Sequence, residues 1–246
     1  MRVPRPAVLL AAYPAGVLTR LLLYMAQHGW GVWSMEQAVV ATIVFGVAVG
    51  LWINERRFAP FAIVAGAVVG TIEVLGNAVS IPEAIGYVRR DEMMDADVDF
   101  YLYLAAHTVV LAVGACALAA AISLAIQYSR AAAMRPLRRV LGVAAVIEAA
   151  LLACIAYFGL GSFEQSKIQT ALLISQLPAA AVLSPMGWCC GVNGGLVFTD
   201  AVDPHWGGLT RIGIPILFVT NSGVIALVLL AVHSLATRAW RPGRNG

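Results

Sequence analysis

Charged side chains are scarce in this chain. Of its 246 residues, 12% are Asp, Glu, Lys or Arg, whereas 61% are hydrophobic. The mean hydropathy of +0.84 lies well above the range of soluble globular domains. The small net charge of +3 comes mostly from arginines at the ends of apolar runs, so it reports on membrane topology and predicts no nucleic-acid partner.

Several sequence signatures of catalysis are also missing. The chain has no GxSxG elbow for serine chemistry, and its glycine-rich stretch 191–195 follows no strand, which excludes a phosphate-binding loop. The four cysteines form no CxxC pair and no repeated metal-ligand spacing. Segments of ~10 residues with alternating polarity, which would indicate a β-barrel, are absent as well. We therefore assign no cofactor from the sequence and leave open whether the chain is an enzyme.

The chain has instead a series of long apolar runs. About 20 apolar residues in a helix cross the ~30 Å hydrocarbon core of a bilayer. These runs predict an all-α polytopic transmembrane bundle that forms a single integral membrane domain over residues 1–246. Gly66, Gly70 and Gly76 in the third run predict a close approach of a neighbouring helix. The candidate spans are 6–26, 36–53, 59–80, 100–127, 139–161 and 212–236.

Arginines divide these spans between the two sides of a membrane. Basic residues precede the first span and follow the second, fourth and last, so the positive-inside rule predicts a cell-membrane protein with both termini in the cytoplasm. This requires an even number of crossings, and we favour six spans over seven. The remaining apolar segment, 171–190, contains Pro178 and Pro185 and ends in glycine-rich sequence, which predicts a broken or re-entrant element.

Three ionisable residues, Arg20, Glu73 and Glu148, fall inside predicted spans. A charge at such a depth costs at least ~2.5 kcal/mol unless it is neutralised, paired or hydrated, so each is a candidate functional residue. We assign all three as candidate catalytic residues. Burial favours the neutral form of a carboxyl such as Glu148, which can then donate a proton.

Arg20 and Glu73 are expected to form a pair. Arg20 lies 15 residues beyond Arg5, a helix rise of ~22 Å. Glu73 lies 16 residues beyond Arg57, a rise of ~24 Å. Both spans run outward, so the two side chains are predicted at similar depth. Such a pair would be either a proton relay or substrate anchor, or a structural ion pair that locks two helices.

Polar and aromatic residues suggest a substrate-binding lining. Asn77 follows Glu73 by one helical turn, and Asn221 lies near the middle of the last span, where polar groups bond other helices or line a cavity. Trp30 and Trp206 lie in predicted outer loops, where indole rings settle at the membrane interface. We assign these four as candidate substrate-binding residues.

Histidine and aspartate residues gather on the predicted outer side. His107 lies two turns into the fourth span, and Asp203 and His205 lie in the last outer loop. Imidazole and carboxylate ligands together suit copper, iron or zinc, so these three are candidate metal ligands. The alternative is that they are interfacial histidines and solvated loop acids.

Three functions agree with these patterns. The first is a membrane-embedded enzyme or enzyme subunit that acts on a lipophilic small molecule from an outer-leaflet cavity, by metal-dependent oxidation or acid-initiated cyclisation. The second is a small-solute or ion transporter that uses Arg20 and Glu73. The third is a non-catalytic subunit whose polar residues fix helix packing. The expected partners are the lipid bilayer, a lipophilic small molecule or small solute, and other membrane subunits.

Overall fold

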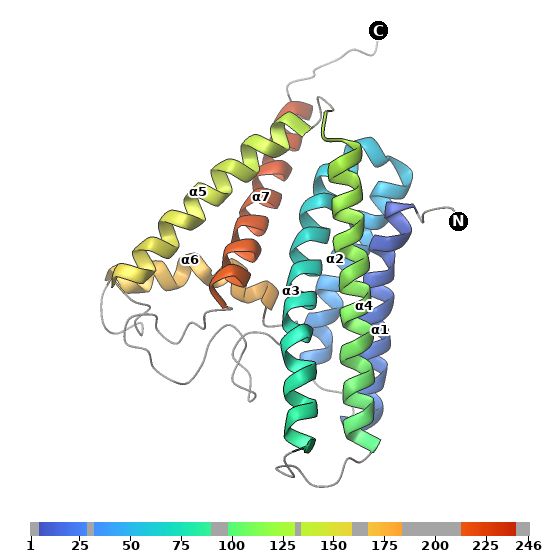
Figure 1. Cartoon of the computed structure of the whole chain (residues 1–246). Coiled ribbons are helices and arrows are strands. Elements are labelled where there is room, and N and C mark those ends of the chain that lie inside the picture. The colour runs from blue at the N-terminus through green and yellow to red at the C-terminus, as the bar shows by residue number, and fades with distance from the viewer. Residues whose placement is uncertain are drawn as a thin grey trace.

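The computed structural model describes residues 5–28, 32–89, 98–130, 134–158, 167–183 and 213–239. Within these ranges the chain is helical and contains no strand, which confirms the all-α prediction for the described residues (Figure 1). The helices are α1 (Pro6–His28), α2 (Val32–Ile53), α3 (Glu55–Arg89), α4 (Val98–Gln127), α5 (Met134–Phe158), α6 (Lys167–Leu183) and α7 (Gly213–Ala239).

Five of the described helices, α1, α3, α4, α5 and α7, are long and apolar enough to cross a membrane. The apolar part of α2, Ala38–Ile53, is shorter, and so is that of α6, Thr170–Ala179. The structure therefore supports a helical membrane bundle. The count of six spans stays a prediction.

The helices form two groups that meet at α7. Helices α1 to α4 pack side by side, and α5 and α7 form a second group beside them (Figure 1). Helix α7 contacts α3 as well as α5 and α6, so it joins the two groups. Helix α6, which contains Pro178, runs across the ends of α5 and α7 instead of alongside them.

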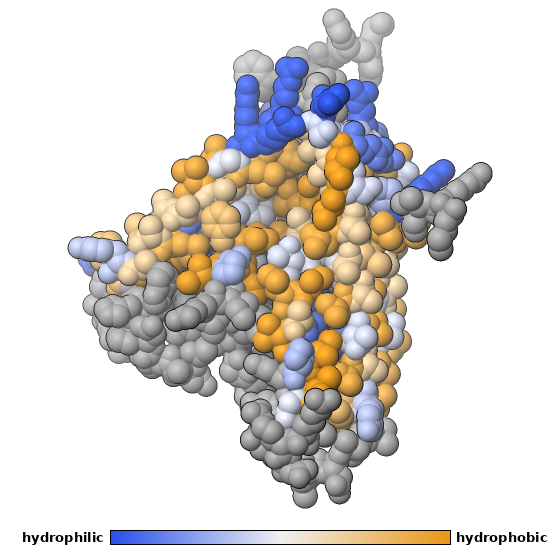
Figure 2. Space-filling view, in the orientation of Figure 1, coloured by the Kyte–Doolittle hydropathy of each residue, from blue (hydrophilic) through white to orange (hydrophobic). Residues whose placement is uncertain are grey.

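The surface separates into a basic end and an apolar belt (Figure 2). The basic end carries exposed arginines at the start of α3, after α4 and in the first turns of α5, including Arg56, Arg130 and Arg139. The positive-inside rule predicts that this end faces the cytoplasm. The belt below it exposes large apolar side chains, as a lipid-facing surface does. Examples are Val39, Ile126, Val146, Val232 and Leu235.

Small residues bring α3 and α4 into close contact. A Cβ added at Gly70 would lie 2.7 Å from the backbone nitrogen of Leu118 and 2.8 Å from the backbone oxygen of Gly114. A Cβ at Gly66 would lie 2.7 Å from the backbone oxygen of Ala117. The close helix approach that Gly66 and Gly70 predict is therefore confirmed. It positions the polar residues of α3 directly against α4.

Candidate functional site

Glu73 lies inside the α1–α4 bundle, where 1% of its surface is exposed. The Tyr13 hydroxyl of α1 donates a hydrogen bond to Glu73 Oε1 at 3.2 Å. Asn77 Nδ2 donates to Glu73 Oε2 at 3.2 Å and to the Glu73 backbone oxygen at 2.7 Å. Asn77 can make both bonds because residues four apart lie on one helix face. Each carboxyl oxygen of Glu73 thus receives a donor from a buried neutral side chain.

His107 of α4 extends this network. The Asn77 Oδ1 atom lies 2.6 Å from His107 Nδ1. A backbone carbonyl oxygen can only accept, so the bond to the Glu73 backbone fixes Nδ2 of Asn77 on that side and leaves Oδ1 facing His107. His107 Nδ1 must therefore carry a proton and donate it, and Nε2 is the ring nitrogen at which protonation changes. Tyr103 packs its ring against the imidazole, with the centroids 4.2 Å apart.

Arg20 of α1 lies beside the network. Its charge acts on Tyr13 and on His107. Arg20 follows Tyr13 by seven residues, ~10 Å along the helix, so both lie on one face of α1.

The predicted pair of Arg20 and Glu73 stays a prediction. The structure adds a contact that the pair did not include, because Tyr13, on which the charge of Arg20 acts, donates to Glu73. The same charge acts on His107.

The packing around Glu73 is tight. A Cβ added at Gly114 of α4 would lie 2.6 Å from the Cβ of Glu73. Tyr13 and Asn77 are almost fully buried, and His107 exposes 8% of its surface. We call Tyr13, Glu73, Asn77 and His107 the α1–α3–α4 network. It connects three helices through protonatable side chains and leaves little space at Glu73 for a bulky substrate.

Glu148 belongs to a second polar cluster, between α5, α6 and α7. Its side chain is fully buried. Asn221 Nδ2 of α7 donates to Glu148 Oε2 at 2.5 Å and to the backbone oxygen of Ser175 in α6 at 3.2 Å. The Gln176 side chain of α6 also interacts with the carboxyl. Two residues that the sequence predicted separately, Glu148 and Asn221, are thus in direct contact.

The remaining predicted residues are not placed. Trp30, Asp203, His205 and Trp206 lie outside the described residues. His107, the other candidate metal ligand, contacts Asn77 through Nδ1. Within the described ranges no three His, Cys, Asp or Glu side chains lie close enough together to hold a metal ion. The metal site therefore stays a prediction that depends on the outer loops.

Two residues of these clusters, Tyr13 and Gln176, are not among the candidates selected from the sequence. Tyr13 lies two helical turns before Arg20, so both lie on the same face of α1 and the spacing was a usable signal. Gln176 is an uncharged polar residue in an apolar segment, two positions before Pro178. It offered only weak evidence, because its neighbours on α5 and α7 are distant in sequence.

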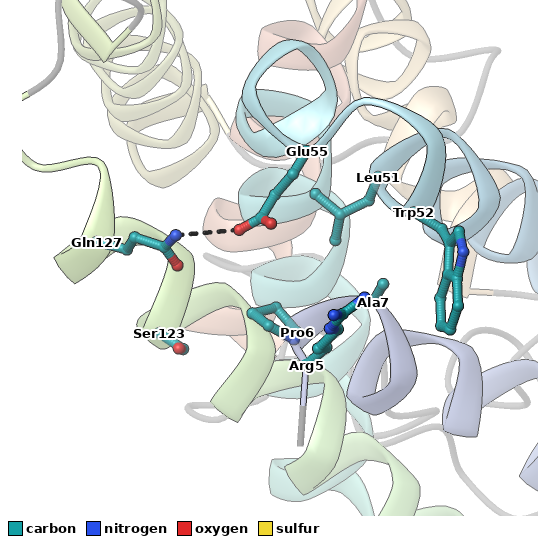
Figure 3. Close-up of a pocket in the computed structure, with 8 residues that line it drawn as sticks. All are labelled: Arg5, Pro6, Ala7, Leu51, Trp52, Glu55, Ser123 and Gln127. Atoms are coloured by element: carbon teal, nitrogen blue, oxygen red, sulfur yellow. Dashed lines mark hydrogen bonds between the residues drawn. The ribbon is translucent and has the colours of Figure 1, made fainter. Parts of the chain in front are cut away.

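A surface pocket of about 340 Å³ opens at the basic end, among α1 to α4. Figure 3 shows Arg5, Trp52 and Glu55 at its wall, with Gln127 Nε2 donating to Glu55 at 3.1 Å. Burial, together with the neighbouring Glu55, raises the pKa of Tyr128, so that phenol stays protonated. Glu55 lies 18 residues before Glu73, ~27 Å along α3, so the pocket is separate from the network.

Comparison with known proteins identifies no matching family model, no matching curated protein and no matching solved structure. The functional argument therefore rests on the two buried polar clusters. Both are built on helices, which hold their side chains in fixed positions.

Replacing Tyr13 by phenylalanine tests the contact at the centre of the network. The variant removes one buried donor from Glu73 and nothing else, so we expect the free energy of unfolding to fall by about 1–2 kcal/mol. Tyr157, which is 83% exposed, provides the matched control, and Tyr157→Phe should change stability by less than ~0.5 kcal/mol. Unfolding in detergent micelles measures the free energy of unfolding of both variants. A Tyr13→Phe variant as stable as the wild-type protein would show that the Tyr13 hydroxyl contributes nothing.

Proposed function

We propose that this chain is a proton-coupled membrane transporter of a small solute or ion, in which the α1–α3–α4 network binds and releases the proton. The observation that supports this most directly is the buried chain of contacts from Tyr13 through Glu73 and Asn77 to His107. Ionisable side chains inside a membrane bundle mark ion pathways and proton relays far more often than they are neutral packing groups.

Protonation of Glu73 would change the contacts of three helices at once. An ionised carboxylate only accepts hydrogen bonds, whereas a neutral carboxylic acid also donates one. Its partners come from α1 and α3, and Asn77 passes the change on to His107 of α4. A proton that arrives or leaves therefore favours one arrangement of these helices over another. Proton-coupled transport requires this link between proton binding and helix movement.

A membrane-embedded enzyme with Glu73 at a lipophilic-substrate cavity fits less well. The acid of such an enzyme must reach a reacting atom within hydrogen-bonding distance. Gly114 packs directly against the Cβ of Glu73, and neutral side chains already occupy both carboxyl oxygens. Transport makes use of this dense packing, because the helices themselves respond to the proton.

Proton flux into liposomes tests the proposal. Liposomes that hold the purified protein and the dye pyranine report proton entry when sodium chloride, potassium chloride, amino acids or sugars are added outside. We expect one of these solutes to drive proton movement, and Glu73→Gln to abolish it because the amide cannot exchange a proton.

Glu55→Gln is the matched control, since Glu55 lies at the surface pocket, where its side chain is only half-buried. It should retain the solute-driven flux. If Glu73→Gln transports as well as the wild-type protein, the proposal is wrong and the network serves helix packing alone.

A further inference from the structure

Four buried polar side-chain atoms lack a hydrogen-bond partner in the described part of the chain, and three of them belong to the cluster at Glu148. These three are Glu148 Oε1, Gln176 Oε1 and Asn221 Oδ1, and the fourth is Ser222 Oγ. The four side chains expose between 0% and 8% of their surface. Buried polar atoms in proteins are almost always paired, so several orphaned atoms in one place indicate that something else binds them.

The orphaned atoms of Glu148, Gln176 and Asn221 are all oxygens. The amide nitrogens of the same side chains are already used, because Asn221 Nδ2 donates to Glu148 and to Ser175, and Gln176 Nε2 donates to the Ser175 hydroxyl. What remains is one carboxyl oxygen and two amide carbonyl oxygens. Hard cations prefer this kind of oxygen ligand set.

The three side chains belong to one cluster because both amides interact with the same carboxyl. Asn221 hydrogen-bonds Glu148 directly, and Gln176 also interacts with it. Helix α6 runs across the ends of α5 and α7 and contacts both (Figure 1). Pro178 lies two residues further on and has no N–H for the helix ladder, so one backbone hydrogen bond of α6 is missing beside the cluster, although the helix continues to Leu183.

The charge of the site selects the valence of the ion. Glu148 can contribute one negative charge, and the side chains that face it from α6 and α7 are the neutral amides of Gln176 and Asn221. On its own helix, Arg139 lies nine residues away, ~14 Å along the axis. A monovalent ion would be neutralised here, whereas a divalent ion would leave an uncompensated positive charge inside the membrane.

We propose that Glu148, Gln176 and Asn221 form a binding site for a monovalent hard cation such as Na⁺. The ion would be held by the three orphaned oxygens. The site is separate from the α1–α3–α4 network and does not depend on the transport proposed for it.

Thermal unfolding in detergent and binding of radioactive ²²Na⁺ test this site. In the wild-type protein we expect NaCl to raise the melting temperature above that in choline chloride of equal concentration, and ²²Na⁺ to bind with a stoichiometry of one.

Variants assign the binding to these residues. Glu148→Gln should lose both the Na⁺-dependent rise in melting temperature and the bound ²²Na⁺, whatever its own melting temperature. Gln176→Glu adds a second carboxylate and should shift the preference from Na⁺ toward Ca²⁺; it also serves if Glu148→Gln does not fold. Glu73→Gln is the matched control, because it alters a buried carboxyl of the other cluster and should bind Na⁺ normally.

Two results would overturn the proposal. One is a wild-type protein that melts at the same temperature in NaCl and choline chloride and binds no ²²Na⁺. The other is Na⁺ binding that persists unchanged in Glu148→Gln and in Gln176→Glu. Loss of proton flux in Glu73→Gln with intact Na⁺ binding would support the network and the cation site as independent features.

Discussion

Replacing Gly70 by alanine is expected to lower the free energy of unfolding by about 1–3 kcal/mol. The new methyl group would lie 2.7 Å from the backbone nitrogen of Leu118 and 2.8 Å from the backbone oxygen of Gly114. Backbone atoms cannot rotate away as a flexible side chain can, so α3 and α4 would have to separate. Because Gly114 also packs on the Cβ of Glu73, the separation would loosen the proton-binding network as well.

Two other glycines make this a controlled experiment. A Cβ added at Gly46 in α2 or at Gly142 in α5 would meet nothing within 4 Å. Gly46→Ala and Gly142→Ala make the same chemical change on a helix without a clash and should raise the free energy of unfolding by up to about 1 kcal/mol through helix propensity. Unfolding by denaturant in micelles compares the three variants. If Gly70→Ala is as stable as Gly46→Ala, the α3–α4 contact is looser than the structure shows.

Replacing Asn77 by leucine should have the second large effect, a loss on the order of 3 kcal/mol in the free energy of unfolding. Leucine fills a similar volume but offers no polar atoms. Glu73 Oε2 would lose the donor Nδ2, and His107 Nδ1 would lose its acceptor Oδ1. Both groups are buried, so water does not replace the missing bonds cheaply.

A double-mutant cycle separates coupling from simple loss of packing. Glu73→Leu removes the carboxyl that Asn77 serves, so the combined variant Glu73→Leu/Asn77→Leu should be more stable than the sum of the two single losses predicts, by about 1 kcal/mol or more. The cycle is measured by the same micelle unfolding. Losses that add within ~0.5 kcal/mol would show that the two side chains act independently.

The general architecture was accessible from local sequence. A run of about 20 apolar residues has few options other than a helix in a membrane, because in lipid every backbone polar group must be satisfied within the segment. The same reasoning marked Glu73 and Glu148, since an isolated carboxyl in such a run is costly and rarely accidental. The small size of Gly66 and Gly70 likewise predicted a close contact between helices.

The depth of one helix against another was decided by tertiary packing. Flanking arginines predicted that Arg20 stands level with Glu73, but only the structure shows that Tyr13 of α1 donates to Glu73. Long basic side chains reach the interface from several depths, so they locate a helix end only to within a turn or two. The contact between Tyr13 and Glu73 depends on how α1 and α3 each pack against α4 and α2.

The composition of the second cluster was also a tertiary result. Glu148 and Asn221 are 73 positions apart, and Gln176 comes from a helix that runs across its neighbours. The sequence by itself determined that these polar groups would be buried in an apolar bundle and would need partners. Which partners they meet was decided by the packing of α5, α6 and α7, because hydrophobic burial is non-directional and sets no register between helices.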